Sequence, residues 1–373
     1  MRVLVVNTGS SSLKLSVLDD ERTVDAQTVE RWDGAGDLDP LRDFLSDAGF
    51  SEGAGLDAIG HRVVHGGPRF RAPVHLDDEA VDYLDSISDL APLHNPRAVS
   101  AIRAMGELLP DLPAVGAFDT AFHATIPEAA ATYALPREWN HRFGLRRYGF
   151  HGLSHAHAVR RGAELVGRPA GELRIVSCHL GAGASLCAVR DGRSVDTTMG
   201  FTPLAGLVMQ TRVGSVDPGI LLWLLEHGGV DVETLGGVLE HQSGLKGLSG
   251  TSGDLRDVLA ARAAGDTDAV LAFDVYVHRL VREIGSMVAS AGGLDLLVFT
   301  GGMGEHSPEV RAATTDGLFH LGVEIDPEVA VDGDTVVTRD GARVHTVVVA
   351  AAEDLEVARE TADVLGATGS EGR

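Results

Sequence analysis

The sequence predicts an α/β protein built from two similar halves, and two observations carry that prediction. Apolar, strand-like runs alternate with helical segments along the chain. In addition, a strand–turn–strand pattern at residues 3–18 returns in degenerate form at residues 175–189, each time around a turn of small residues. Gly and Ser in such turns let backbone N–H groups approach an anion closely. Two of these hairpins about half a chain apart predict a duplicated domain with phosphate held between the halves.

Composition narrows the class of protein. With 373 residues and 44% hydrophobic content, the chain can bury a large core, and we expect two domains, residues 1–150 and 151–373. A C-terminal helix at about 353–367 is expected to pack back onto the first domain. The 54 acidic and 31 basic residues give a formal charge of −23, which argues against nucleic acid or an anionic membrane as partner.

Three further features predict a cytoplasmic protein. No run approaches the roughly 18 apolar residues of a membrane span. The N-terminus enters a strand directly, unlike a signal peptide. The two cysteines, Cys178 and Cys187, both lie in apolar strand-like runs, so we expect them to be reduced core residues.

Short apolar runs bounded by turn residues predict the strands. They fall at residues 2–7, 13–19, 57–64, 113–118, 173–179, 185–190, 294–300 and 344–350. A helix is expected at 78–90, and the next one begins with Asn95 as N-cap and Pro96 at the first helical position. The longest helix is expected at 268–290, where apolar residues recur at helical spacing and a Gly-Gly pair follows.

Two charged residues at predicted strands are candidates for chemistry. Arg62 lies inside strand 57–64, just before a Gly-Gly pair, and its guanidinium can bind a carboxylate or phosphate with two hydrogen bonds. The alternative is a surface arginine on an edge strand. Asp119 follows strand 113–118, where α/β proteins place ligands, and suits metal or acid/base work. The alternative for Asp119 is a helix N-cap.

Histidines gather between residues 123 and 157. A zinc site is the obvious alternative, since His151 and His155 are four residues apart. We expect Gly152 to interrupt that potential helical turn, and neither cysteine has zinc-finger spacing. His151, beside an aromatic residue and a glycine, is better suited to donate to a charged oxygen.

The remaining chemical motifs lie in the second half. Arg212 stands in a turn rich in Gly, Ser and Pro, and two arginines facing one centre would stabilise a transferring phosphoryl group. Residues 243–254 are expected to form a long loop that ends in a helix cap. Strand 294–300 runs into Gly301-Gly302-Met303-Gly304 before a helix from Pro308, which is a nucleotide-type turn but not the Walker pattern.

Six motifs occur in an order that is typical of a known family. They are Asn7-Thr8-Gly9-Ser10-Ser11-Ser12-x-Lys14, His61-Arg62-Val63-Val64-His65-Gly66-Gly67, Leu90-Ala91-Pro92-Leu93-His94-Asn95-Pro96, Phe118-Asp119-Thr120-Ala121-Phe122-His123, Tyr148-Gly149-Phe150-His151-Gly152 and Phe299-Thr300-Gly301-Gly302. On these motifs the chain resembles the acetokinase family, in the actin, sugar-kinase and Hsp70 superfamily, from about residue 2 to residue 362. The resemblance implies a duplicated actin-like (ribonuclease H-like) fold with the active-site cleft between the domains.

The resemblance also implies a reaction: reversible, Mg²⁺-dependent transfer of the ATP γ-phosphoryl group to acetate, giving acetyl phosphate and ADP. Mn²⁺ could replace Mg²⁺, and the family forms homodimers through the C-terminal domain. The catalytic residues implied are Arg62, Asp119, His151 and Arg212. The substrate-binding residues implied are Arg62 and His94, with a small apolar pocket of Val64, Leu93, Phe150 and Pro203. The metal-binding residues implied are Asn7 and Glu353, which offer the oxygen atoms that Mg²⁺ prefers.

The same resemblance implies a set of nucleotide-binding residues. These are Lys14, His179, Leu180, Gly181, Ala182, Gly183, Asp254, Leu255, Arg256, Gly302, Met303, Gly304, Glu305 and His306. The chain departs from the family pattern on this side. Ala182 replaces an Asn, Gln210 a Gly, Ser215 an Asp and His306 an Asn, while Ala351-Ala352-Glu353-Asp354 replaces Thr-Asn-Glu-Glu.

Two alternatives to this reaction stay open. One is an acyl kinase that uses propionate or butyrate, or another phosphoryl donor such as pyrophosphate. The other is a nucleotide-driven binding protein without catalysis, since a fold alone does not fix a function. Arg62, Arg212, Asp119 and His151 around an acyl pocket argue against that second alternative, because a binding protein needs no second-substrate site.

Overall fold

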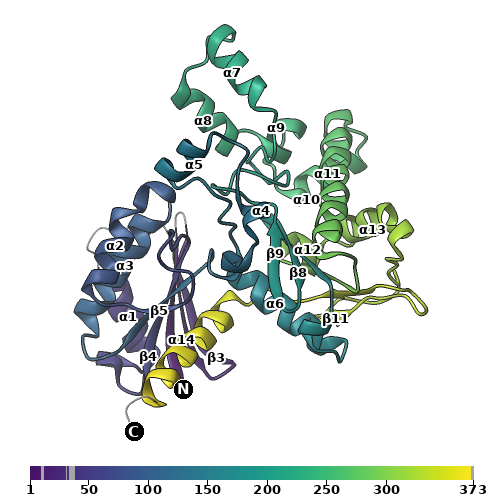
Figure 1. Ribbon diagram of the computed structural model, residues 1–373. Helices are drawn as coiled ribbons and strands as arrows, with labels where there is room; N and C mark the ends of the chain where they lie inside the picture. The colour runs from purple at the N-terminus through teal and green to yellow at the C-terminus, as the bar shows by residue number, and fades with distance from the viewer. Residues whose placement is uncertain (10–11, 31, 33–37, 371–373) are drawn as a thin grey trace. The chain divides into compact units, whose positions relative to one another are not determined.

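The computed structural model describes residues 1–9, 12–30, 32 and 38–370 (Figure 1). The chain divides into two compact units. The first unit holds residues 1–124, residues 150–157 and the chain from Ala352 onward, and the second unit holds residues 125–149 and 158–351. Each unit contains one six-stranded mixed sheet.

The two sheets have the same topology, which confirms the predicted duplicated fold. Strand order is β3-β2-β1-β4-β6-β5 in the first unit and β9-β8-β7-β10-β12-β11 in the second. In both, three antiparallel strands are followed by two parallel ones and an antiparallel edge strand. The first sheet consists of β1 (Arg2–Thr8), β2 (Ser12–Asp19), β3 (Arg22–Glu30), β4 (Ala58–Val63), β5 (Val74–His75) and β6 (Ala114–Phe118). The second consists of β7 (Ile175–Leu180), β8 (Ala184–Arg190), β9 (Arg193–Thr197), β10 (Leu296–Thr300), β11 (Thr335–Val336) and β12 (His345–Val348).

The predicted strands are all present, and four further strands were missed. These four are the edge strands β3, β5, β9 and β11. β3 carries exposed, mostly polar side chains, and β5 and β11 are two residues long. An edge strand with few buried side chains has no apolar run to reveal it in the sequence.

The helices of the first unit cover its sheet. They are α1 (Asp39–Asp47), α2 (Asp78–Ser86), α3 (Asn95–Leu108) and α14 (Glu353–Ser370), together with the start of α6 (Gly152–Leu165). Figure 1 shows α14, in yellow, against the strands of this sheet, and it contacts β1, β4 and β6. Val357 and Ala358 of α14 pack with Val3 and Val5 of β1. This packing brings the start of α14 to the ends of the central strands.

Two details of the predicted helices are wrong. The helix expected at 78–90 ends at Ser86, and a 3₁₀ turn follows at Ser88–Leu90. Asn95 is not an N-cap, because α3 includes it and His94 is the residue before the helix. The Asn95 side chain is fully buried instead: its amide nitrogen donates to the His65 carbonyl (2.9 Å) and its oxygen accepts from the His65 N–H (3.2 Å). Asn95 therefore fixes the loop that follows β4.

The second unit is richer in helices. They are α4 (Glu128–Ala131), α5 (Arg137–Phe143), most of α6, α7 (Pro218–His227), α8 (Val232–His241), α9 (Gly244–Ser249), α10 (Leu255–Ala263), α11 (Thr267–Ala291), α12 (Gly302–His306) and α13 (Pro308–Gly317). The other 3₁₀ turns of the chain are Ser51–Gly53, Phe122–Thr125, Ala170–Glu172 and Phe319–Leu321. The long helix α11 is confirmed, with Gly292 in the left-handed conformation at its end (φ 78°). The loop expected at 243–254 is wrong in part, because α9 lies inside it.

Two further observations bear on the sequence predictions. Cys178 and Cys187 are fully buried thiols, as expected of reduced core residues. Among the described helices, none combines the length and the apolar character that crossing a bilayer requires.

Candidate active site

Arg62 is the centre of a charged cluster at the end of the first sheet. Its guanidinium forms a two-point ion pair with Asp119: Nε lies 3.1 Å from Oδ1, and NH2 lies 2.8 Å from Oδ2. A second carboxylate, that of Glu353, lies 2.5 Å from NH1. Burial alone would lower the pKa of Arg62, but the two carboxylates outweigh burial and raise it above its usual range. Arg62 is therefore a fixed positive charge held in a defined orientation.

Neighbouring backbone fixes Asp119. The residue follows β6, and its N–H donates to the Val63 carbonyl of β4 (3.0 Å). The Asp119 carbonyl in turn accepts from the N–H of Gly152, the first residue of α6 (2.8 Å). A Cβ on Gly152 would lie 2.2 Å from that carbonyl oxygen, so only glycine fits there. Asp119 is almost fully buried, and its carboxylate is paired with Arg62.

The two residues expected to bind metal meet at one nitrogen of Arg62. Asn7 Oδ1 lies 3.3 Å from NH1, the same nitrogen that pairs with Glu353. Two oxygen donors of the kind that Mg²⁺ prefers are thus gathered at one point, which fits a hard cation completed by water and phosphate oxygens. Within the described part of the chain, no group of three or more His, Cys, Asp or Glu side chains could hold a metal ion.

Asp354 is a site residue that the sequence prediction missed. It is 8% exposed and follows Glu353 at the start of α14. Its carboxylate accepts from the Asn7 amide nitrogen (3.3 Å) and the Ser16 hydroxyl (2.8 Å), and it pairs with Lys14 Nζ (2.7 Å). The sequence does contain one signal for Asp354, because it adjoins Glu353, which the resemblance implies to bind the metal.

His151 has a strained backbone at the start of α6. Its φ of 57° is in the left-handed region, which residues other than glycine rarely adopt. Both neighbours are anchored: Phe150 is 1% exposed and its carbonyl lies 3.0 Å from His123 Nε2, while Gly152 bonds Asp119. Since a carbonyl only accepts, His123 Nε2 carries the hydrogen. The expectation that Gly152 interrupts the helix is wrong, because α6 begins with it.

The residues expected to bind the acyl group differ in their surroundings. Phe150 is buried with its ring edge-on to His65 (centroids 5.6 Å apart), whereas Leu93 is 43% exposed. Val64 and His94 are half-buried in the same unit. Pro203 belongs to the second unit, so a shared pocket stays a prediction.

Arg212, in the second unit, differs sharply from Arg62. Its NH1 donates to the Pro203 carbonyl (2.9 Å), and no carboxylate within 4.0 Å pairs with it among the described residues. Burial lowers the pKa of Arg212, although an arginine stays protonated in proteins. A half-buried guanidinium without an anionic partner is suited to bind an anion.

A cavity of about 600 Å³ in the second unit gathers many of the residues expected to bind the nucleotide. It is lined by residues from the three predicted segments: Gly181, Ala182, Asp254, Leu255, Arg256, Gly302, Met303 and His306. Sequence reasoning missed the other lining residues, namely Leu259, Ser307, Pro308, Glu309 and, as a binding residue, Gln210. That nucleotide binds there stays a prediction.

The other expected nucleotide residues are not among those that line this cavity. They are His179, Leu180, Gly183, Gly304 and Glu305 in the second unit, and Lys14 in the first. Leu180 and Gly304 are buried, and Glu305 accepts a hydrogen bond from the Ala351 N–H (3.0 Å). Ser10 and Ser11 of the first predicted phosphate turn lie outside the described residues.

Gly301 shows why the turn before α12 needs glycine. Its φ is 77°, and a Cβ would lie 2.9 Å from the Leu180 carbonyl oxygen. The chain therefore leaves β10 in close contact with the end of β7. This contact brings two of the predicted nucleotide segments together.

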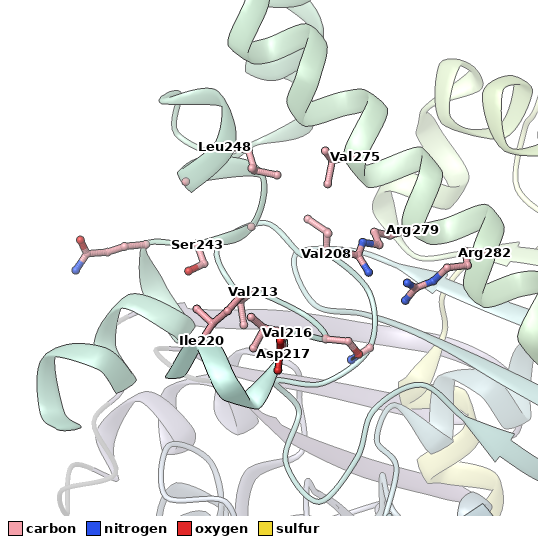
Figure 2. A pocket seen from close by; sticks show the side chains of 15 residues that line it. Val208, Val213, Val216, Asp217, Ile220, Ser243, Leu248, Val275, Arg279 and Arg282 are labelled. Carbon is pink, nitrogen blue, oxygen red and sulfur yellow. Dashed lines mark hydrogen bonds between the residues drawn. The ribbon is translucent and has the colours of Figure 1, made fainter. Parts of the chain in front are cut away.

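A second cavity, of about 750 Å³, is lined in part by α7 and α11 in the same unit. Figure 2 shows Ile220, Val213 and Val216 on one side, and Arg279 and Arg282 of α11 on the other. Its lining includes Ser215 from the arginine loop but none of the residues assigned a catalytic or binding role.

Comparison with known proteins gives concordant matches over nearly the whole chain. The sequence profile described as the Acetokinase family matches residues 27–359. An acetate kinase of Synechococcus sp. (strain JA-2-3B'a(2-13)) is 44% identical, covering 98% of this chain and 99% of the relative, and one of Shouchella clausii is 42% identical, covering 96% and 98%. The crystal structure of Porphyromonas gingivalis acetate kinase matches with a TM-score of 0.92 at 34% identity, covering 98% of this chain and 99% of that one. A propionate kinase from Francisella tularensis matches with a TM-score of 0.88 at 34% identity, covering 96% and 98%.

Proposed function

This chain belongs to the acetokinase family, and we infer that it is an enzyme that phosphorylates acetate with ATP. The reaction is the reversible transfer of the γ-phosphoryl group to the acetate carboxylate, giving acetyl phosphate and ADP by direct in-line transfer. The observation that supports it best is the Arg62 cluster, in which one guanidinium is fixed by Asp119 and Glu353. A guanidinium held in this way is suited to bind a small carboxylate or phosphoryl ligand.

Acetate itself needs little activation in this reaction. Its carboxylate is already ionised at pH 7, so no general base has to remove a proton. The role that fits Asp119 is to hold Arg62 through Nε and NH2, while NH1 faces Asn7 and Glu353, where we expect the reacting groups to bind. Arg62 would bind the acetate carboxylate or the transferring phosphoryl, with His94 nearby.

Stabilising the charge on the transferring phosphoryl group is the main task. Arg212 supports this role, because its guanidinium has no carboxylate partner among the described residues. His151 supports it through its left-handed backbone between two anchored neighbours, which fixes the point from which the imidazole extends. We propose that both donate to the equatorial oxygens in the transition state.

Mg²⁺, or Mn²⁺ in its place, is the proposed cofactor. Asn7 and Glu353 would hold it, since their oxygens converge on the same nitrogen of Arg62. When bound, the cation supplies charge neutralisation for the phosphate oxygens of the nucleotide. ATP and ADP are proposed to occupy the cavity between Ala182 and Met303.

We further propose a homodimer formed through the second unit. Helix α7 carries an unbroken apolar run, and Leu222 (60%) and Trp223 (58%) are exposed on it. A helix that is apolar on all sides is normally buried, which a second copy would achieve. Trp223→Glu is expected to convert the dimer to a monomer in light scattering. The two buried, reduced thiols suit a reducing compartment, and we propose that the protein is cytoplasmic.

Acyl phosphate formation, trapped as the hydroxamate, tests the proposed activity. Acetate, propionate and butyrate are each supplied with Mg-ATP, and acetate is also supplied with pyrophosphate. Turnover with acetate and ATP is expected, with propionate used less well, because a pocket discriminates one methylene by only about 1–3 kcal/mol. Preference for propionate would make the enzyme a propionate kinase, as the Francisella relative is named. Turnover with pyrophosphate alone would show that pyrophosphate, and not ATP, is the phosphoryl donor. Silence with every pair would contradict the function.

A further inference from the structure

We propose that Asp354 is a positioning residue that turns the Asn7 amide so that its oxygen faces the metal position. The inference rests on the proposed function in taking Asn7 as a metal ligand. Asp354 touches neither substrate nor metal in this scheme, and it acts through Asn7 and Lys14.

The two neighbours of the Asn7 side chain determine its orientation. On one side, an ionised Asp354 can only accept hydrogen bonds, and Oδ1 lies 3.3 Å from the Asn7 nitrogen. On the other side, Arg62 can only donate, and NH1 lies 3.3 Å from the Asn7 oxygen. A flipped amide would set donor against donor and acceptor against acceptor. The amide oxygen is therefore fixed toward Arg62 and Glu353.

Asp354 is itself held in place on its other oxygen. Oδ2 accepts from the buried Ser16 hydroxyl of β2 (2.8 Å) and pairs with Lys14 (2.7 Å) from the same strand. The Asp354 side chain is 12% exposed, so water does not compete strongly for these contacts. This side chain joins the start of α14 to the β1–β2 hairpin. The two segments are far apart in the sequence, since Ser16 and Asp354 are 338 residues apart.

Pairing with Lys14 adds a second consequence. Lys14 is half-exposed, and its ammonium is held next to Asn7, its partner across the β1–β2 pair. A point charge held at this position would be ready to meet phosphate oxygens that approach the metal. The expected result of losing Asp354 is thus weaker binding of the metal and its nucleotide, with the sheet intact. Groups that orient metal ligands typically change metal affinity about 10–100-fold when they are mutated.

Mn²⁺ binding to the intact protein tests this proposal without relying on turnover. Free Mn²⁺ is measured by electron paramagnetic resonance in the presence of ADP. We expect Asp354→Asn to weaken Mn²⁺ binding at least about 10-fold. Asp354→Glu keeps an acceptor-only carboxylate and should stay within about threefold of the wild type. Asp363→Asn, the same change on an exposed position of α14, is the matched control and should have no effect.

Exchanging the hydrogen-bond donor and acceptor between positions 7 and 354 distinguishes an effect on the orientation of residue 7 from an effect on folding. Asn7→Asp alone sets two carboxylates against each other and should lose Mn²⁺ binding, although a carboxylate is ordinarily the better Mg²⁺ ligand. The double variant Asn7→Asp/Asp354→Asn restores one donor facing one acceptor and should recover at least part of the loss. Circular dichroism and thermal melting check that each variant folds.

Two results would overturn the proposal while leaving the proposed function standing. One is unchanged Mn²⁺ binding in Asp354→Asn, and the other is a double variant no better than Asn7→Asp. A wild-type protein that forms acyl phosphate yet binds no Mn²⁺ with ADP would overturn this proposal together with the proposed metal ligands. A wild type that forms no acyl phosphate but shows the predicted Mn²⁺ pattern would contradict the function and leave the role of Asp354 intact.

Discussion

The two units have sheets of the same topology, but the side chains at corresponding positions of these sheets differ in charge. In the first sheet, Asn7 of β1 pairs with Lys14 on one side and Arg62 on the other. In the second sheet, the corresponding residue of β7 is His179, which pairs with Ser185 and Thr300. Both second strands even carry their irregularity at a similar point, between Val17 and Leu18 and between Ala188 and Val189. The backbone is repeated, but the charges are not.

This difference predicts which ligand each unit binds. The first unit concentrates paired charges, with Arg62 fixed by carboxylates at its sheet end. In the second unit, the predicted nucleotide segments line a cavity of about 600 Å³ beside a glycine-rich turn, and the ion pair in its lining, Asp254–Arg256, is far more exposed than that of Arg62 and Asp119. The predicted division is that the first unit handles metal and phosphoryl acceptor, and the second handles the nucleotide.

Removing the charge at the centre of the first unit should have the largest effect. Arg62→Ala leaves the buried Asp119 and the partly buried Glu353 without their cation. We expect kcat to fall on the order of 10⁴-fold and the free energy of unfolding to fall by about 3–5 kcal/mol. The hydroxamate assay and urea unfolding measure the two effects. Arg103→Ala breaks only exposed ion pairs and is the control; equal losses in both variants would contradict a special role for Arg62.

The arginine of the second unit should matter for rate but not for folding. Arg212→Ala removes a guanidinium that has no carboxylate partner among the described residues, so no buried charge is left uncompensated. We expect kcat to fall on the order of 10³-fold with an unfolding midpoint close to that of the wild type. Steady-state kinetics and thermal melting test this contrast with Arg62. Near-normal turnover would remove Arg212 from the site.

The units should also differ in pH sensitivity, because burial lowers the pKa of two histidines of the first unit. Burial lowers the pKa of His61 to about 3 and that of His65 to about 4. The unfolded chain, with histidine pKa values near 6.5, then binds more protons, so stability is lost as the pH falls below about 6.5. Each histidine contributes about 2 kcal/mol of this loss between pH 7.5 and 5.

His65→Asn isolates one of these contributions. The Asn oxygen can accept from the Gly67 N–H, as His65 Nδ1 does at 2.8 Å, but it does not titrate. Urea unfolding at pH 7.5 and pH 5 should therefore show a drop about 2 kcal/mol smaller than in the wild type. An identical drop in both proteins would show that His65 does not carry the effect.

A change in the turn of the second unit should give the smallest effect. Ala182→Asn adds an amide donor where Ala182 lines the cavity, and a hydrogen bond to a charged phosphate is worth about 1.5 kcal/mol. We expect the KM for ATP to fall about tenfold. Gln210 lies on the same wall, its N–H bonded to the Ala182 carbonyl (3.1 Å). An unchanged KM would indicate that the Gln210 side chain already supplies the missing donor, which Gln210→Gly would then reveal.

Much of the fold was predictable because the central strands are buried. β1, β4, β6, β7 and β10 consist mostly of buried residues with an apolar run in each, and the repeated hairpin marked the duplication. Edge strands such as β3 face solvent and escape detection. Asn95 has the sequence pattern of a helix cap, but its side chain forms hydrogen bonds with the His65 backbone instead. Local patterns could not reveal that competition.

The site was predictable to the extent that its residues adjoin central strands. Arg62 and Asp119 lie in or just after neighbouring parallel strands, so the sheet brings them together. Asp354 depends on a helix that returns to the first sheet from the far end of the chain. Gln210 reaches the cavity through a loop. Asp354 supports Asn7 from a different element, and the signals in the sequence were only that Asp354 adjoins Glu353 and that Gln210 lies two residues before Arg212.

Calorimetric titration with ADP tests the division between the units most directly. Arg62→Ala and Ala182→Trp are compared with the wild type, the second variant filling the cavity of the second unit. We expect Arg62→Ala to bind ADP within about threefold of the wild type, and Ala182→Trp to lose at least about tenfold, since bulk in a cavity displaces its ligand. Loss of ADP affinity in Arg62→Ala together with unchanged affinity in Ala182→Trp would contradict the prediction that the second unit binds the nucleotide.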